Sequence, residues 1–244
     1  KYLYSNMPYS DVGNYTFDTY LDYVQQGIYL WENSPYVKNY PELYFLNYVL
    51  FHRTNDEEIK PCRTYFWEKI KDKVQGKTMV EAALEINHWC AGEVMYQGTD
   101  MRTGSALEIY RSGVGRCGEE AVFVVNVMRS AGIPARPVYV PRWSHCDDNH
   151  AWVEVWCDGD WHYLGACEPE AVLDKSWFTN AASRAMMIGS RWYDRAMPDE
   201  KVIGKDGMNR IINLLGKYAK TGGSLLQWKI WMELRQLGQK YGLR

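Results

Sequence analysis

The segment from Gly113 to Pro134 constrains the fold of this chain more than any other part of the sequence. A glycine-rich approach, Gly113-Val114-Gly115-Arg116-Cys117-Gly118, leads into the mostly apolar residues 119–131. The β-branched residues of this run would also suit a strand. Its length, and its ending at Gly132 and Pro134, favour a buried helix with glycine just past its C-terminus. We therefore predict a buried helix that carries Cys117 at its start.

Three strand-like runs follow this helix, at residues 135–143, 151–157 and 161–166. Asp158-Gly159 separates the last two runs and is a strong signal for a tight β-hairpin turn. A helix followed by consecutive strands predicts an α+β fold with an antiparallel sheet.

The N-terminal residues 1–78 are expected to form a helical region packed on a core at residues 79–204. Within this region, apolar and aromatic residues recur at helical spacing, namely Tyr20, Leu21, Val24, Ile28 and Trp31. The run 43–51 is apolar on nearly all sides and is predicted to be buried.

Thr78 and Glu81 have the spacing of a capping box and predict a helix from residue 78 to about residue 96. C-terminal helices are expected at 205–244, with a flexible Gly-Gly-Ser linker at 222–224. The amphipathic stretch 225–243 would dock on its own domain, or bind a partner or a membrane surface.

Charge and composition exclude several classes of function. Lys plus Arg number 28 and Asp plus Glu number 30, which gives a net charge of −2. That balance argues against nucleic acid as a partner. No apolar stretch reaches the ~18 residues of a membrane span, so no transmembrane segment is expected. The 15% aromatic content favours an aromatic-rich core over a carbohydrate- or peptide-binding groove.

The six cysteines include no CxxC pair, which argues against zinc-ribbon and thioredoxin-type sites. The segment His145-Cys146-Asp147-Asp148-Asn149-His150 is rich in metal-ligand types and could bind zinc with Cys117, Cys157, His162 or Cys167. The paired spacing of zinc sites is missing, however. We expect no metal and no cofactor.

Cys117 is the candidate nucleophile. Free backbone N–H groups at a helix N-terminus favour a thiolate, so the pKa of Cys117 should be lowered. Gly118 leaves room for an attacking substrate, and the same N–H groups could hold an oxyanion. The alternative is a buried cysteine that acts as a small hydrophobic residue.

His150 is the candidate base. It lies 33 residues after Cys117, at the start of a predicted strand. A histidine there could take the thiol proton and later protonate the leaving group. The predicted hairpin should return residues 165–168 to its side, so Glu168 is the favoured orienting acid and Asp174 is the second candidate.

Four motifs together resemble the transglutaminase-like core, a superfamily that includes transglutaminases, bacterial cysteine proteases and peptide:N-glycanases. They are Gly115-Arg116-Cys117-Gly118-Glu119, Ala131-Gly132-Ile133-Pro134-Ala135-Arg136, Asn149-His150-Ala151-Trp152-Val153-Glu154-Val155 and Gly159-Asp160-Trp161. The wider pattern resembles a bacterial group of unassigned substrate. The resemblance implies a papain-like Cys-His-acid site, with Cys117 as nucleophile and His150 as base.

One position departs from the family pattern. The family's Asp usually stands four residues after the hairpin Trp, where this chain has Gly165. Glu168 could reach the imidazole in its place. The alternative is a Cys-His dyad supported by Asn149 or by backbone.

Further residues could complete the site. The superfamily often supports the oxyanion with a side chain upstream of the cysteine, for which the candidates are Trp89, Tyr96 and Gln97. Trp89 and Tyr96 could equally face the core. Asp147 and Asp148 could favour a cationic substrate group. Asn149 and Trp152 flank His150 and are candidates for substrate contact.

The sequence therefore predicts a thiol enzyme acting on a peptide or protein substrate, with water favoured as acyl acceptor. Transfer to an amine, glycan removal from asparagine, and a catalytically silent binding module are the alternatives. The glycanase branch carries a CxxC zinc pair that this chain lacks. No leader is visible in the sequence, and a bacterial extracytoplasmic or cytoplasmic location would both fit.

Overall fold

The computed structural model describes residues 1–98, 100, 102–185 and 188–190 of the chain. The predictions for residues 205–221, 222–224 and 225–243 lie outside these described residues. The described chain divides into two units, one formed by residues 1–138 with 151–176 and the other by 139–150 with 177–190. The domain boundaries expected at residues 78/79 and 204/205 stay a prediction.

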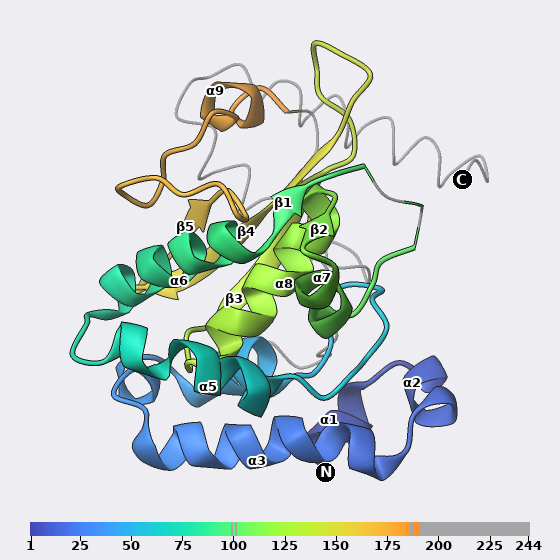
Figure 1. Ribbon diagram of the computed structural model, residues 1–244, viewed down its shortest axis with the longest axis vertical. Helices are drawn as coiled ribbons and strands as arrows, with labels where there is room; N and C mark the ends of the chain where they lie inside the picture. The colour runs from blue at the N-terminus through green and yellow to red at the C-terminus, as the bar shows by residue number, and fades with distance from the viewer. Residues whose placement is uncertain (99, 101, 186–187, 191–244) are drawn as a thin grey trace, which may run out of the picture. The chain divides into compact units, whose positions relative to one another are not determined.

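The first unit is mostly helical up to residue 130 (Figure 1). Its helices are α1 (Tyr2–Asn6), α2 (Tyr9–Asn14), α3 (Phe17–Asn33), η1 (Val37–Asn39), α4 (Glu42–Phe45), η2 (Leu46–Leu50), α5 (Arg63–Val74), α6 (Met79–Glu93), α7 (Ala106–Ser112) and α8 (Cys117–Ser130).

Two short strands, β1 (Met95–Tyr96) and β2 (Val114–Gly115), pair in parallel just before α8. A second sheet has the order β3-β4-β5, formed by β3 (Ala135–Val140), β4 (His150–Cys157) and β5 (Asp160–Leu164). Strands β4 and β5 are antiparallel. The α+β fold class is confirmed.

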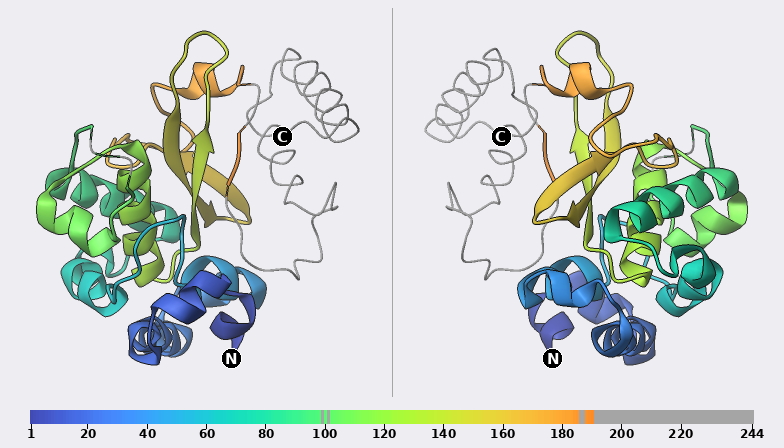
Figure 2. Two further views of the ribbon diagram at one scale, coloured as in Figure 1. Left: turned by 90° about the vertical axis from the view of Figure 1, so that its right-hand side faces the viewer. Right: turned by 90° about the vertical axis from the view of Figure 1, so that its left-hand side faces the viewer.

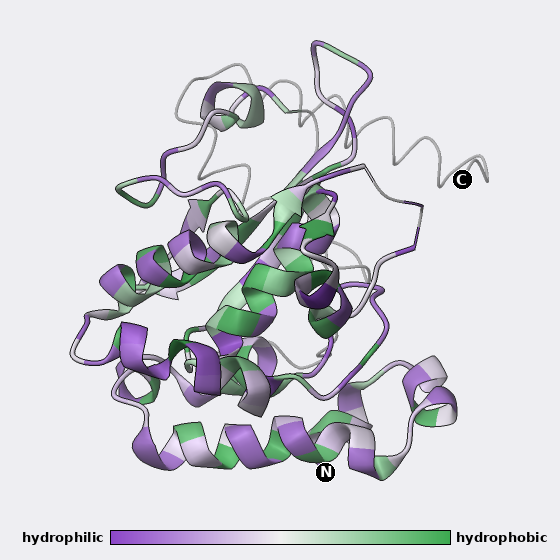
Figure 3. Ribbon diagram, in the orientation of Figure 1, coloured by the Kyte–Doolittle hydropathy of each residue, from purple (hydrophilic) through white to green (hydrophobic). Residues whose placement is uncertain are grey.

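Helix α8 is the centre of the first unit. Its apolar side chains from Ala121 to Met128 are fully buried. It packs against α5, α6 and α7, and these helices lie on one side of the strands (Figure 2). Figure 3 shows α8 mainly in hydrophobic colours, whereas α3 alternates between the two extremes. Gly132 ends the helix with φ +83°, as the sequence predicts.

The predicted hairpin is present. Asp158 and Gly159 join β4 to β5 with φ values of +53° and +87°, the two positive angles of a type I′ turn. Arg136 on β3 donates to the Glu154 carboxylate on β4 at 2.8 Å. Its guanidinium lies 4.0 Å from the centre of the Trp161 ring on β5, so one buried side chain links all three strands.

The helix expected from the spacing of aromatic and apolar residues after Tyr20 is present as α3. Its buried face holds Tyr20 together with Gln26, Gly27 and Leu30, whereas Ile28 and Trp31 are 55% and 46% exposed. Gln26 donates to the backbone oxygen of Ser130 at 2.9 Å. At Gly27 a Cβ would meet Leu50 Cδ1, so the helices approach closely there. The buried face of α3 therefore depends in part on a polar residue and a glycine, which a pattern of hydrophobic residues does not predict.

The helix that begins at the capping box ends earlier than expected, and the apolar run 43–51 forms two short helical segments. The helix with the Thr78 and Glu81 capping box is confirmed, but it ends at Glu93, and Tyr96 lies in β1. The buried run 43–51 forms α4 followed by the π-helical turn η2, in which Phe51 N–H donates to Leu46 at 3.1 Å.

The second unit holds the loop 141–149 and α9 (Thr179–Ala182). An isolated antiparallel bridge between Tyr139 and Gly189 connects its two segments, with both N–H···O distances at 2.9 Å. The strand predicted for residues 135–143 ends at Val140, just before Pro141. Trp143 therefore lies in the loop, where its side chain is nevertheless buried.

Candidate active site

Cys117 is the first residue of α8, and a small sheet holds the approach to it. Strand β2 pairs with β1 so that Tyr96 faces Gly115, and the Gln97 N–H donates to the Gly115 oxygen at 2.9 Å. The carboxylate of Glu119 accepts from the Arg116 N–H at 3.2 Å and from the Gly104 N–H at 3.2 Å. This acidic side chain in the first turn stabilises the end of the helix that carries the cysteine.

The thiol of Cys117 is half-buried, and its pKa is raised rather than lowered. Burial is the largest cause. The backbone groups of Gly118, in the first turn of α8, and of Ala151, on β4, lower the pKa, whereas the charge of Glu120 raises it further. The sequence expectation of a lowered pKa is therefore wrong, because burial outweighs the backbone N–H groups.

His150 is the first residue of β4 and belongs to the second unit, where aromatic rings surround it. Its ring centre lies 4.8 Å from that of Trp177 and 5.0 Å from that of Phe178, and Trp143 stacks on it at 6.2 Å. Burial lowers the pKa of His150 to about 4, although the Asp148 carboxylate favours the charged ring. At neutral pH the imidazole is therefore neutral and able to accept a proton.

The chain itself links the two candidate groups. Ala151, whose backbone lowers the pKa of the Cys117 thiol, is covalently next to His150. Ala151 and Cys117 both lie within the first unit.

Glu168 folds back over Gly165. The two residues form an antiparallel bridge, in which the Glu168 N–H donates to the Gly165 oxygen at 3.1 Å. A Cβ at position 165 would lie 2.8 Å from the Cβ of Glu168 and closer still to its Oε2. The Glu168 carboxylate therefore occupies the space that a longer side chain at position 165 would need.

Asp174, the second candidate acid, has other partners. Its Oδ2 lies 2.6 Å from Nδ1 of His162, and its Oδ1 accepts from the Tyr163 N–H at 2.9 Å. Both oxygens of the Asp174 carboxylate therefore contact residues of β5.

Glu120 and Asn87 are buried polar residues near this turn that the sequence reasoning missed. Burial raises the pKa of Glu120 to about 8, and the charges of Glu168 and Glu119 add to the effect. Asn87 on α6 is 2% exposed and bonds to the backbone of the turn at Gly165 and Cys167. Asn87 could have been noticed in the sequence, because this polar residue interrupts an apolar helix face that includes Ala83 and Cys90.

The remaining predicted residues have different surroundings. Trp89 is half-buried and packs on Tyr110 and Phe123, with ring centres 6.0 Å away in each case. Trp152 is fully buried, so its side chain offers no exposed surface to a substrate.

Several predicted polar residues are open to solvent, namely Gln97, Asp147, Asp148 and Asn149. Asp147 forms an ion pair with Arg142 at 3.3 Å, and Asp148 Oδ1 accepts from the Asn149 N–H at 2.8 Å. Gly118 follows Cys117 in the first turn of α8.

Among the described residues, none of the six cysteines forms a disulfide bond. The described part of the chain has no group of three or more His, Cys, Asp or Glu side chains that could hold a metal ion. Within the same residues, no helix combines the length and apolar character needed to cross a bilayer.

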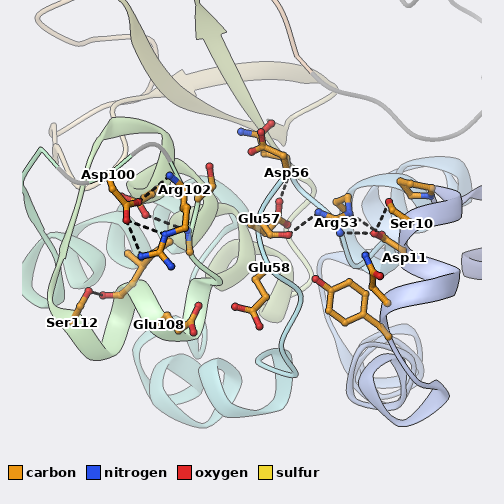
Figure 4. A pocket seen from close by; sticks show the side chains of 18 of the residues that line it. Ser10, Asp11, Arg53, Asp56, Glu57, Glu58, Asp100, Arg102, Glu108 and Ser112 are labelled. Carbon is orange, nitrogen blue, oxygen red and sulfur yellow. Dashed lines mark hydrogen bonds and ion pairs between the residues drawn. The ribbon is translucent and has the colours of Figure 1, made fainter.

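A polar cavity of about 1040 Å³ lies in the first unit beside the start of α8 (Figure 4). Val114 and Glu119, which flank Cys117 in the sequence, form part of its lining. Its charged walls are largely paired, as in the contacts of Asp11 with Arg53 at 2.7 Å and of Asp100 with Arg102 at 2.7 Å. The cavity therefore lies next to the helix end that carries the cysteine.

Part of the chain is similar to a known protein family. Residues 68–166 match the family model of the transglutaminase-like superfamily. This segment is similar to the core that the family model describes. It runs from α5 to just past β5 and contains Cys117, His150 and Gly165, while Glu168 lies two residues beyond it. At the level of the superfamily, the match supports a cysteine-based enzyme.

A search of curated proteins finds no match to the chain. The crystal structure of a proposed cysteine protease from Cytophaga hutchinsonii aligns with 22% sequence identity and a TM-score of 0.36. The alignment covers 43% of this chain and 36% of that protein, so the chain spans about a third of its length.

Proposed function

We propose that the transglutaminase-like segment is a thiol hydrolase that cleaves a peptide or carboxamide bond through an acyl-enzyme on Cys117. The observation that carries this proposal is the place of Cys117 at the N-terminus of α8, where the backbone of Ala151, the residue after His150, favours the thiolate. Glu168, folded over Gly165, is proposed to orient the imidazole.

The raised pKa of Cys117 and the lowered pKa of His150 favour a neutral resting pair over a thiolate–imidazolium pair. His150 takes the thiol proton as Sγ forms a bond to the substrate carbonyl carbon. Backbone N–H groups at the start of α8, with Gln97, hold the oxyanion. The C–N bond then breaks, and His150 gives its proton to the leaving amine.

Water then attacks the thioester with His150 as base. This step releases a carboxylic acid and restores the thiol. An amine in place of water would give acyl transfer instead. Incubation of the acylated enzyme with a primary amine, followed by mass spectrometry of the product, distinguishes the two acceptors.

The proposal is tested by iodoacetamide labelling of the native protein from pH 5 to 9, read for each cysteine by mass spectrometry. General-base help from His150 should keep Cys117 reactive down to about pH 5, where a free thiol is almost unreactive. The His150→Ala variant should lose this reactivity by about a hundredfold at pH 7. A Cys117 that reacts no faster than Cys146, which is exposed, would contradict the proposal and favour a silent binding module.

A further inference from the structure

Asn87 uses both ends of its side-chain amide on one short turn. Its Nδ2 donates to the Gly165 oxygen at 2.9 Å, and its Oδ1 accepts from the Cys167 N–H at 3.1 Å. The side chain is buried on α6, so water cannot replace either bond easily. The amide therefore fixes two backbone groups that lie two residues apart.

The turn between these two groups is sharp and carries Glu168. Cys167 has φ +56°, an uncommon angle for a residue with a side chain. The next residue is Glu168, whose N–H returns to the same Gly165 oxygen that accepts from Asn87. One carbonyl oxygen thus receives a bond from the helix and a bond from the residue that carries the acid.

The acid is held over this turn. Its Cβ lies 2.8 Å from the point that a Cβ of residue 165 would occupy. The direction of the Glu168 side chain therefore depends on the backbone at Gly165 and Cys167, and that backbone depends on Asn87.

We propose that Asn87 is a positioning residue of the active site, which fixes the 165–167 turn and, through it, the direction of the Glu168 carboxylate. This inference rests on the proposed function, because it acts through the acid assigned there. A polar residue with one donor and one acceptor is needed at position 87, since an apolar side chain would leave both backbone groups unsatisfied.

The experiment is a double-mutant cycle read by the rate of Cys117 alkylation. The variants are Asn87→Ala, Glu168→Gln and the two combined. The matched control is Asn126→Ala, which removes another buried asparagine from the first unit. Asn126 bonds to Val122 and to Arg63, and neither of these residues belongs to the turn.

If Asn87 acts through Glu168, each single variant slows alkylation at pH 7 by about tenfold or more, and the double variant is no slower than the slower single one. The logarithm of the rate should then rise by nearly one per pH unit in both variants, as for an unassisted thiol. Asn126→Ala should lower the urea midpoint and leave the rate and its pH profile unchanged.

Effects that multiply in the double variant would overturn the inference, as would wild-type alkylation by folded Asn87→Ala. If Asn87→Ala does not fold, the near-isosteric Asn87→Asp decides, because it keeps an acceptor for the Cys167 N–H and loses the donor to Gly165. Failure of the proposed function has a different signature, in which His150→Ala leaves the rate unchanged. A Glu168→Gln variant with the wild-type rate, alongside a slow His150→Ala, would overturn the positioning role alone.

Discussion

The buried carboxyl group of Glu120 should make the stability of this protein depend on pH. It lies one helical turn after Cys117, it is 4% exposed, and its pKa is raised to about 8 by burial and by the charges of Glu168 and Glu119. The unfolded chain loses this proton near pH 4.5, whereas the folded chain keeps it up to about pH 8. Its contribution to stability is therefore complete below pH 4.5 and decreases as the pH rises to 8.

We predict that Glu120→Gln, which keeps a neutral side chain of the same shape, gains stability relative to the wild type as the pH rises from 5 to 8. The difference in free energy of unfolding should grow by at most about 1.4 kcal/mol per pH unit. Urea denaturation at pH 5, 6.5 and 8 measures it, with the exposed Glu68→Gln as control. A difference that does not change with pH would show that Glu120 is ionised in the folded protein.

The exchange of Gly165 and Glu168 tests whether the acid has moved along the chain. Glu168→Ala should slow Cys117 alkylation at pH 7 by about tenfold or more. Gly165→Asp combined with Glu168→Gly should restore much of the rate, because it puts an acid at the usual family position and removes the whole side chain, Cβ included, that fills the space there.

The single variant Gly165→Asp is the control for this exchange. Its new Cβ would collide with Glu168, so it should be less stable than the double variant. Thermal unfolding and alkylation rates of the three proteins decide the matter. A double variant that reacts as slowly as Glu168→Ala would mean that position 165 cannot serve the imidazole.

At the scale of elements, the sequence predicts best where one local signal is enough. Helix α8 and the turn at Asp158-Gly159 follow from glycine and proline placement and from a single apolar run. The capping box at Thr78 and Glu81 correctly starts α6. Helix α3 shows the limit, because Gln26 and Gly27 face inward for reasons that depend on Ser130 and Leu50, far away in the sequence.

The candidate site was predictable to the same extent. Cys117 and His150 stand out because a glycine-rich helix start and a strand start are local patterns. The pKa of Cys117 was not predictable, because burial of the thiol depends on how the whole unit packs. Asn87 was missed for a related reason, since its partners at Gly165 and Cys167 lie 78 and 80 residues away.

At the scale of the whole molecule, a buried ionic cluster in the N-terminal helices should set its tolerance of acid. Asp11 on α2 accepts from Arg53 Nε at 2.7 Å and lies 2.9 Å from His52 Nε2. Burial alone would raise the pKa of Asp11, but the bonds from His52 and Arg53 outweigh it and lower the pKa to about 2. Burial lowers the pKa of the fully buried His52, and the bond to Asp11 offsets only part of this.

The shifted pKa values of His52 and Asp11 both lower the stability of the fold as the pH falls. Below about pH 6.5 the unfolded chain protonates His52 while the folded chain resists, so stability is lost on acidification. Asp11 adds a second loss as the pH falls from 3.8 toward 2. A ring that cannot be protonated at position 52 removes the loss of stability that comes from His52 and leaves the loss that comes from Asp11.

We therefore predict that His52→Phe has a flatter dependence of stability on pH than the wild type between pH 7 and 5, by at most about 1.4 kcal/mol per pH unit. The phenyl ring can keep the packing that His52 makes with Tyr20 and Phe51, whose ring centres lie 4.9 and 4.7 Å away. Loss of the hydrogen bond to the buried, ionised Asp11 should cost about 2 kcal/mol at pH 7. Urea midpoints at pH 7, 6 and 5 measure both effects, with His88→Phe as control because His88 is exposed on α6. Parallel pH profiles for His52→Phe and the wild type would mean that His52 does not set the acid limit, and that carboxylates such as Asp11 do.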